Sequence, residues 1–266
     1  MERDFENTAL VARLCDLAER AERGEVAISS FLSPREGALV SRYLSTRGMV
    51  YRLFGGYDDA ERVRAYLLPS YMEASMADMG TLDELLQAFG FESRISCLRV
   101  TGSGYVSLSH RDFLGSLLGL GLERSVIGDV VVSEASVQAL VFCDETIAPF
   151  LLSEWKKVGN DTVKTSRLSL SVLDIPPRRF APIHDTLASP RLDGVVASLC
   201  RMSRDRAKTT VESGFVELNF ETEERPDRTV EEGAILSVRG FGRYRIISVS
   251  GQTKKGRFRL EAQKYL

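Results

Sequence analysis

Apolar residues near the start of the chain recur at the spacing of a helix. Between residues 5 and 22 they share one helical face among charged neighbours, and they are Leu10, Leu14, Leu17 and Ala21. The pattern predicts an amphipathic helix. A second helix is predicted from Ser33, because Pro34 suits the first turn and Glu36 completes a capping box with the serine.

Strand-like and helix-like stretches follow up to residue 75. The apolar run at 49–54 leads into two glycines and predicts a strand. Asp58 and Glu61 have the spacing of another capping box, so a short helix is predicted from there towards Pro69. Together these elements predict a small N-terminal α/β domain over residues 1–75.

Residues 76–175 predict a second domain. Thr81 and Glu84 form a capping box for its first helix, which Gly90 ends. Strands and helices then follow in the order β-α-β-β-α-β, at residues 93–100, 110–120, 127–132, 137–143, 145–157 and 162–170. This is the split-βαβ plan of ferredoxin-like and RRM-like domains, which often serve as RNA platforms, although fold alone does not establish that use. We predict a central RNA-binding domain here.

The last part of the chain predicts a third domain. Residues 176–188 are rich in proline and have little periodicity, so they are predicted to be a linker. Two short helices are then predicted, one starting at Ser189 and one capped by Ser203. Strands are predicted at 215–219, 234–239, 243–249 and 256–263. The whole chain is therefore expected to be an α+β protein of three small units, the last over residues 189–266.

Composition is ordinary for a soluble folded protein, with 44% hydrophobic and 27% charged residues. Charge, however, is uneven along the chain. From Pro190 to the end, 15 lysines and arginines face 11 aspartates and glutamates, whereas the preceding residues carry 20 against 26. A basic C-terminal unit on an acidic body predicts that any contact with a polyanion is concentrated at that end.

No membrane segment or signal peptide is expected. The most apolar run, at 113–122, is about half of the ~20 residues needed to cross a bilayer, so a buried helix is predicted there. The four cysteines lie far apart and form no C-x-x-C pair, which argues against a metal cluster, a redox motif or a disulfide framework. We expect a cytoplasmic protein without a metal or another cofactor.

The stretch from Ser109 to Asp112 is the most tempting catalytic candidate, because a histidine there lies beside an arginine and an aspartate. Ser109 and Asp112 also have capping-box spacing just before an apolar run, which explains both residues structurally. We therefore disfavour a catalytic role for His110. A phosphate or ribose contact by His110 or Arg111 at this helix start is the better hypothesis, because a helix N-terminus attracts anions.

Two other motifs are weak. The glycines at 115, 119 and 121 lie among leucines with no Lys-Ser/Thr after them, so helix packing is favoured over a phosphate-binding loop. The sequence around Asp193 is similar to the G-R-L-D motif of pseudouridine synthases, but Pro190 replaces the glycine and too few residues follow for the large catalytic domain. The helix macrodipole is a sufficient reason for Asp193.

Basic residues are better organised in the last unit. Arg201, Arg204 and Lys208 have the spacing of one helix side, and a second cluster is predicted at strand ends and turns. The second cluster comprises Arg239, Arg243, Arg245, Lys254, Lys255 and Arg257. A solvated basic face is the simpler alternative. Two clusters in one basic unit, with Phe241 expected to be exposed between two glycines, favour binding to the RNA backbone.

The stretch Arg239-Gly240-Phe241-Gly242 matches the first four places of the RNP1 signature of RRM domains. Alternation along a strand, however, puts Arg243 and not a second aromatic residue on the side of Phe241. Tyr244 and Ile246 are expected to point the other way. We therefore predict a tight corner between two strands, with its arginines directed at phosphate.

These motifs together resemble a known family. The segment "RLDGVVASLCRMSRDRAKTTVESGFVELNF" with "VRGFGRY" is similar to an S4-type RNA-binding domain, and "FGGYDDAER", "SHRDFLGSLLGLGLERSVIGDVVV" and "GQTKKGR" resemble the YlmH family of bacterial S4-domain proteins. The resemblance covers nearly the whole chain, and its motifs occur in the same order. It implies binding to the large ribosomal subunit in ribosome-associated quality control.

By position, the resemblance implies RNA contacts at Arg201, Arg204, Arg206 and Lys208 and, on the sheet side, at Arg243, Lys254, Lys255 and Arg257. His110 and Arg111 in the central domain are candidates for a second RNA contact. The implied partners are rRNA of the large subunit, the tRNA of a stalled complex and a NEMF-type factor that adds C-terminal tails.

We therefore expect a non-enzymatic RNA-binding protein that stabilises stalled peptidyl-tRNA complexes. Two alternatives stay open from the sequence. One is an RNA-modifying enzyme that uses the S4-type domain only for delivery, with His110 or Asp112 as its best catalytic candidate. The other is an adaptor for cell division whose acidic N-terminal unit binds a protein partner.

Overall fold

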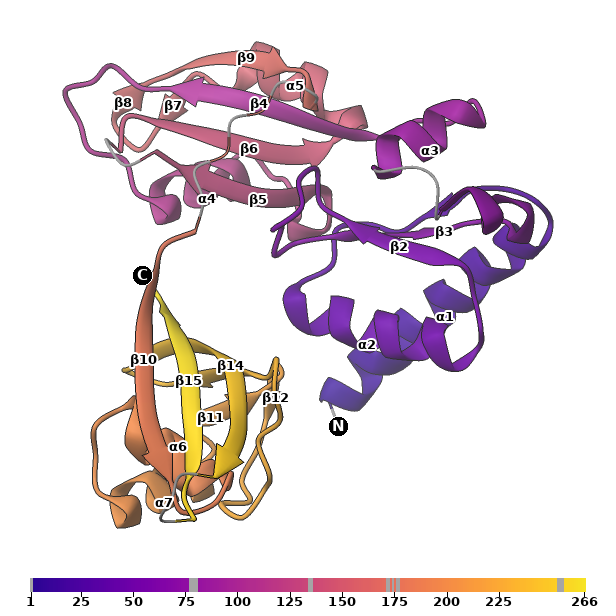
Figure 1. Cartoon of the computed structure of the whole chain (residues 1–266). Helices are drawn as coiled ribbons and strands as arrows, with labels where there is room; N and C mark the ends of the chain where they lie inside the picture. The colour runs from indigo at the N-terminus through magenta and orange to yellow at the C-terminus, as the bar shows by residue number, and fades with distance from the viewer. Residues whose placement is uncertain are drawn as a thin grey trace. The chain divides into compact units, whose positions relative to one another are not determined.

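The structure of the chain is a computed structural model (Figure 1), which describes residues 2–76, 81–133, 136–170, 173, 175, 178–252 and 256–266. The chain forms two compact units, Met1–Ile175 and Pro176–Leu266. Both combine helices with antiparallel sheets, which confirms the α+β class. Among the described helices, none is both long enough and apolar enough to cross a membrane.

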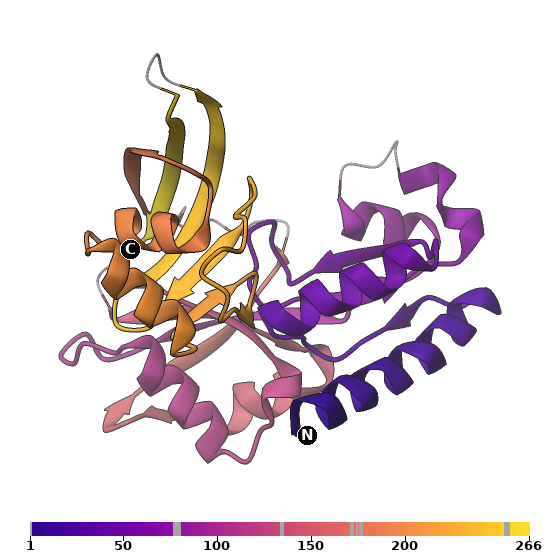
Figure 2. The same cartoon turned by 90° about the horizontal axis from the view of Figure 1, so that it is seen from below.

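The first unit begins with two helices, α1 (Glu2–Glu22) and α2 (Pro34–Thr46), as the apolar spacing predicts. Both helices lie on the same side of a three-stranded sheet (Figures 1 and 2). The sheet has the order β1-β3-β2, with β1 at Ala27–Ile28, β3 at Arg64–Leu67 and β2 at Tyr51–Phe54. The predicted capping box at Ser33 is present, because its side chain accepts from the Glu36 backbone N–H.

The helix predicted from Asp58 is wrong. The chain turns there and enters β3, the central strand of the sheet, which pairs with β1 and β2. The backbone N–H groups of Glu61 and Arg62 donate to the carboxylate of Asp129 at 2.7 and 2.9 Å. A partner distant in sequence thus satisfies the donors that a helix N-terminus would leave free.

The second part of this unit contains the predicted βαββαβ order. Its strands are β4 (Ile95–Thr101), β5 (Ile127–Val132), β6 (Gln138–Asp144) and β9 (Lys164–Leu168). They form an antiparallel sheet of order β5-β6-β4-β9, in which β6 lies between the two strands of the first βαβ unit. The helices are α4 (His110–Gly119), after β4, and α5 (Ala148–Glu154), which a 3-10 turn precedes. Smaller elements are α3 (Leu82–Ala88), β7 (Lys157–Val158) and β8 (Asp161–Thr162).

The two faces of this sheet have different neighbours. On β4, Leu98 and Val100 pack in one apolar cluster with α4 and α5, while Ile95 and Cys97 point to the opposite face. That opposite face packs against the N-terminal part of the chain, where Phe31, Tyr66, Leu68 and Met72 join the same buried cluster. The predicted domains 1–75 and 76–175 therefore share a core within one compact unit.

Gly128 shows how closely these two parts approach. A Cβ atom at this position would lie 2.7 Å from the Phe31 ring and 3.0 Å from the Cβ of Phe142. Nearby, the Tyr57 hydroxyl donates to Asp129 at 2.7 Å, and the Arg62 guanidinium donates to the carbonyls of Ile127 and Arg124 at 2.8 and 2.7 Å. Close contact and hydrogen bonds thus hold the two parts together.

Asp129→Ala is expected to lower the free energy of unfolding of the first unit by about 1–2 kcal/mol, because three donors lose a charged acceptor that is only partly exposed to water. Asp129→Asn keeps one acceptor oxygen and is expected to lose less. Urea denaturation of the full chain measures both changes. Equal stability of Asp129→Ala and wild type would contradict this account of the contact.

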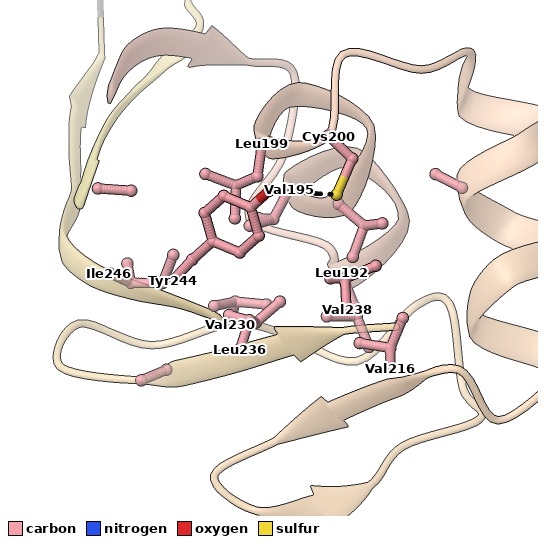
Figure 3. Close-up of a cluster of buried hydrophobic side chains, with 14 of the residues drawn as sticks. Leu192, Val195, Leu199, Cys200, Val216, Val230, Leu236, Val238, Tyr244 and Ile246 are labelled. Atoms are coloured by element: carbon pink, nitrogen blue, oxygen red, sulfur yellow. Dashed lines mark hydrogen bonds between the residues drawn. The ribbon is translucent and has the colours of Figure 1, made fainter. Parts of the chain in front are cut away.

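The second unit contains α6 (Leu192–Leu199), α7 (Arg204–Glu212) and a six-stranded antiparallel sheet of order β10-β15-β14-β13-β11-β12. The strands are β10 (Phe180–Leu187), β11 (Val216–Leu218), β12 (Glu221–Thr222), β13 (Ile235–Val238), β14 (Gly242–Gln252) and β15 (Phe258–Tyr265). Apolar side chains of α6 meet those of β13 and β14 in the core, where Tyr244 is 1% exposed (Figure 3).

The predicted linker over residues 176–188 differs from the structure. Residues 180–187 form β10, and every residue of this strand has a partner in β15. The proline at 182 is compatible with this because β10 is an edge strand, where a missing backbone N–H costs little. The compact C-terminal unit accordingly begins at Pro176 rather than at residue 189.

Candidate nucleic-acid interface

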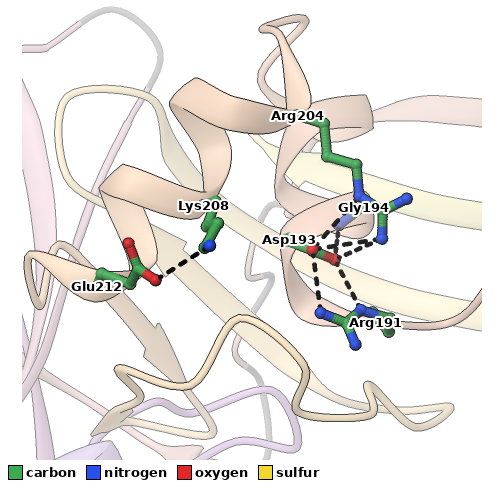
Figure 4. A network of polar contacts seen from close by, with 6 residues as sticks. All are labelled: Arg191, Asp193, Gly194, Arg204, Lys208 and Glu212. Atoms are coloured by element: carbon green, nitrogen blue, oxygen red, sulfur yellow. Dashed lines mark hydrogen bonds and ion pairs between the residues drawn. The ribbon is translucent and has the colours of Figure 1, made fainter.

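Arg191 and Arg204 converge on one buried carboxylate at the start of α6 (Figure 4). The Arg204 Nη2 lies 3.2 Å from the Asp193 Oδ1, and the Arg191 Nη2 lies 3.3 Å from the Asp193 Oδ2. The Gly194 backbone N–H also donates to Asp193, at 2.7 Å. The sequence explains Asp193 by the helix dipole, but the structure adds a second role in which its carboxylate holds two arginines together.

Exposure differs sharply within this cluster. The Asp193 side chain is 6% exposed, whereas the side chains of Arg191 and Arg204 are 42% and 53% exposed. Burial alone would raise the pKa of Asp193, but hydrogen bonds from the two arginines and from Gly194 outweigh it and lower this pKa. The carboxylate is therefore ionised near neutral pH, and each guanidinium keeps a side open to solvent, where a phosphate oxygen could bind.

The other predicted basic residues of this region are arranged less regularly. The spacing predicts that Arg201 continues the helix side formed by Arg204 and Lys208, but this prediction is wrong. Arg201 precedes α7 and has a left-handed φ of 51°. Lys208 pairs with Glu212 at 3.7 Å, and both side chains are about half exposed. Arg201 and Arg206 are exposed, and neither has an ion-pair partner in the described part of the chain.

The Arg239–Gly242 stretch forms the predicted corner between β13 and β14. Gly240 and Gly242 have φ values of 82° and 116°, a region that favours glycine, and the Phe241 N–H donates to the Val238 carbonyl at 3.0 Å. Tyr244, which is predicted to point the other way from Arg243, is buried in the core. The predicted exposure of Phe241 is wrong, because its ring is half-buried and packs against that core.

Two arginines of the sheet lie against aromatic rings. The Arg239 guanidinium lies 5.2 Å from the centre of the Phe215 ring, which is 44% exposed. Arg243 is half-buried between the rings of Phe220 and Tyr265, at 5.9 and 5.7 Å. Stacked arginine and aromatic groups can bind bases as well as phosphates. The sequence did not reveal Phe215, because strand pairing alone brings it to Arg239.

The remaining sheet-side candidates differ in position. Arg257 is exposed and donates to the Thr186 carbonyl at 2.6 Å, and Arg245 is exposed on β14. Lys254 and Lys255 lie outside the described residues. The predicted sheet-side contacts therefore occupy separate places: the β13–β14 corner, the strand face and the beginning of β15.

His110 and Arg111 are exposed in the first turn of α4, as predicted. The capping box there is complete, and Asp112 accepts from the Ser109 backbone N–H at 2.8 Å and from the Ser109 hydroxyl at 2.6 Å. These bonds from Ser109 lower the pKa of Asp112. The carboxylate is thus used in capping the helix.

The cysteines are not paired in disulfides, and three of them are buried. All four are free, and burial raises the pKa of Cys97 and of Cys143 to about 12, which keeps both thiols protonated near neutral pH. Within the described ranges, no three His, Cys, Asp or Glu side chains come together as they would around a metal ion.

Comparison with known proteins identifies the class first. Residues 91–171, which include β4 to β9, match the family model described as "Putative RNA-binding domain in YlmH". The chain is therefore an α+β protein that contains a domain of this YlmH type.

The relatives then identify the family. "Ribosome-associated protein quality control protein P2" of Bacillus subtilis is 36% identical over 239 residues, which cover 90% of this chain and 87% of that protein. The chain belongs to the YlmH family. The solved structure of cell division protein ylmH from Streptococcus pneumoniae is also similar, with a TM-score of 0.48 and 20% identity, over 64% of this chain and 95% of that one.

Proposed function

We propose that the protein binds RNA of the large ribosomal subunit through its C-terminal unit. The arginine pair held on Asp193 carries this proposal, because it presents two fixed guanidinium groups in the same unit as the exposed Arg201 and Arg206. Each of these groups can neutralise a phosphate and release its counterions. The ribosome association named for the Bacillus subtilis relative supports the same target.

In this proposal the protein also contacts tRNA and stabilises stalled peptidyl-tRNA complexes in ribosome-associated quality control, with a NEMF-type tailing factor as a partner. It works in the cytoplasm, where ribosomes are, and acts by binding rather than by catalysis. The capping role of Asp112 supports the binding role, because it gives the carboxylate beside His110 a structural explanation.

Replacing Arg201 and Arg206 together with alanine tests the proposal. Two lost phosphate contacts should weaken binding to purified large subunits and lower the slope of log K against log salt by about two. Filter binding or sedimentation over a series of salt concentrations measures both quantities for the full chain.

Arg20→Ala with Arg23→Ala is the matched control, because it removes the same charge from exposed positions on and just after α1. This control is expected to bind with the wild-type slope. An unchanged slope for Arg201→Ala with Arg206→Ala would contradict the proposed role of the C-terminal unit. An equal loss of affinity in both double variants would indicate that net charge alone determines binding, and would contradict the proposed role as well.

A further inference from the structure

The central sheet cannot bind RNA as the sheet of an RRM does. An RRM stacks bases on the sheet face that its helices leave uncovered. In this chain that face is buried against the N-terminal part, where Cys97 and Phe142 are fully buried together with Phe31 and Tyr66. RNA that reaches the central domain must therefore meet another surface.

The same sheet face becomes free at the far end of β4. Arg99 and Thr101 continue the face of Cys97, and Lys164 of β9 lies opposite Thr101 in the register. Arg99 and Lys164 are both exposed, and among the described residues neither has an ion-pair partner. This end of the sheet thus presents two cations on one face.

A loop leads from this end of β4 to α4 (Figure 1). Tyr105 is one of its residues. Its side chain is 95% exposed, the highest value among the large apolar and aromatic side chains described as exposed. By contrast Tyr71, 54% exposed, stacks against Phe89 at 5.7 Å and donates to the Gly24 carbonyl at 3.2 Å. Contacts among the described residues account for the position of the Tyr71 ring but not for that of the Tyr105 ring.

The loop around Tyr105 is held at both ends. The Gly102 N–H donates to the Val137 carbonyl at 2.8 Å, and the Ser103 N–H donates to the Asp161 carboxylate at 2.9 Å. On the other side, Leu108 is 2% exposed, and its N–H donates to the Ser136 carbonyl at 2.7 Å. An anchored loop limits the conformational entropy lost when an exposed ring binds a ligand.

We propose that Tyr105 stacks on an unpaired base of the bound RNA and that Arg99 and Lys164 contact the adjoining phosphates. This inference rests on the proposed function and adds a second RNA contact, in the central domain, to that of the C-terminal unit. A tyrosine ring can stack on any base, whereas the cations provide the salt-dependent part of the affinity.

Tyr105→Ala, in the full chain with purified large subunits, tests the stacking contact. Binding is expected to weaken on the order of 5- to 100-fold, which is typical for the loss of one stacked base, while the salt slope stays at its wild-type value. Tyr105→Phe keeps the ring and is expected to restore nearly full binding. Val106→Ala, in the same loop, is the matched control and is expected to bind as wild type does.

Arg99→Ala with Lys164→Ala should instead lower the salt slope by about two. Ultraviolet crosslinking of the wild-type complex, followed by mass spectrometry, should find a nucleotide attached to the peptide that contains Tyr105. Wild-type affinity of Tyr105→Ala would overturn the stacking contact. A crosslink from this peptide to a ribosomal protein and not to a nucleotide would overturn it as well.

The two proposals fail in different ways. If wild type binds and Arg201→Ala with Arg206→Ala binds more weakly, but Tyr105→Ala does not, only the central contact is wrong. If wild type does not bind large subunits, the proposed function is wrong and the central contact with it.

Discussion

Arg64→Ala is expected to lower the free energy of unfolding of the Met1–Ile175 unit by about 3–5 kcal/mol. Arg64 is 6% exposed, and its guanidinium lies 2.8 Å from the Asp144 carboxylate. It also donates to the carbonyls of Ser29 and Arg94 at 2.7 and 2.9 Å. Alanine would leave all three acceptors without this donor and open a cavity beside Phe31.

Denaturation in urea, followed by far-ultraviolet circular dichroism, measures this effect. Arg52→Ala is the control, because Arg52 lies on the neighbouring strand β2, is exposed, and donates a long hydrogen bond of 3.3 Å to the Met76 carbonyl. Arg52→Ala is expected to lower the free energy of unfolding by less than about 0.5 kcal/mol. Arg64→Lys keeps the charge but cannot reach three acceptors in this geometry, so an intermediate loss is expected. A wild-type midpoint for Arg64→Ala would refute this view of the buried arginine.

Asp193→Ala is expected to lower the free energy of unfolding of the C-terminal unit by about 3 kcal/mol. The carboxylate is almost fully buried, and it accepts from Arg191, Arg204 and the Gly194 N–H. Both arginines are about half exposed and can be hydrated after the change, which keeps the loss at the lower end of the range for buried ion pairs. Asp205→Ala, at an exposed acid in the first turn of α7, is the matched control, with an expected loss below about 1 kcal/mol.

The stability of the same unit should also depend on pH through Asp193. Its pKa in the folded state lies below the ordinary 3.8, because the hydrogen bonds outweigh the opposing effect of burial. A depressed pKa means that the stabilisation is complete above pH 3.8 and is lost as the pH falls below that value. The difference in free energy of unfolding between wild type and Asp193→Asn, measured by urea melts, should therefore become smaller as the pH is lowered from 5 to below 3.8. A constant difference between them would contradict the link to this carboxylate.

Local patterns predicted much of the fold because their physical cause is local. The capping boxes at Ser33, Thr81 and Ser109 are present in the structure, since each joins groups only three residues apart. Asp58 and Glu61 have the same spacing but form no helix. The acceptor that captures the backbone there is Asp129, about 70 residues away, and spacing along the sequence cannot reveal such a partner.

The candidate site was predicted to a lesser degree. Alternation along β14 predicted only that Tyr244 points away from Arg243, and the structure shows that its side chain is buried in the core while Arg243 is half-buried. The glycines beside Phe241 predicted a corner between two strands, but they did not predict how the Phe241 ring packs. The aromatic neighbours of Arg239 and Arg243 could not be predicted either, because strand pairing brings them together. Proline suggested a linker where β10 forms, since the residue itself does not distinguish a loop from an edge strand.

The pairing of β10 has a consequence for the order in which the C-terminal unit can fold during its own synthesis. β10 is the first strand of the unit to leave the ribosome, and its partner β15 is the last. Until Phe258–Tyr265 emerges from the exit tunnel, β10 has no hydrogen-bonding partner in its sheet and β14 has only one. A chain interrupted before Phe258 would therefore lack the strand that joins β10 to the rest of the sheet. The unit can therefore complete its sheet only once Phe258–Tyr265 is free to pair with both β10 and β14.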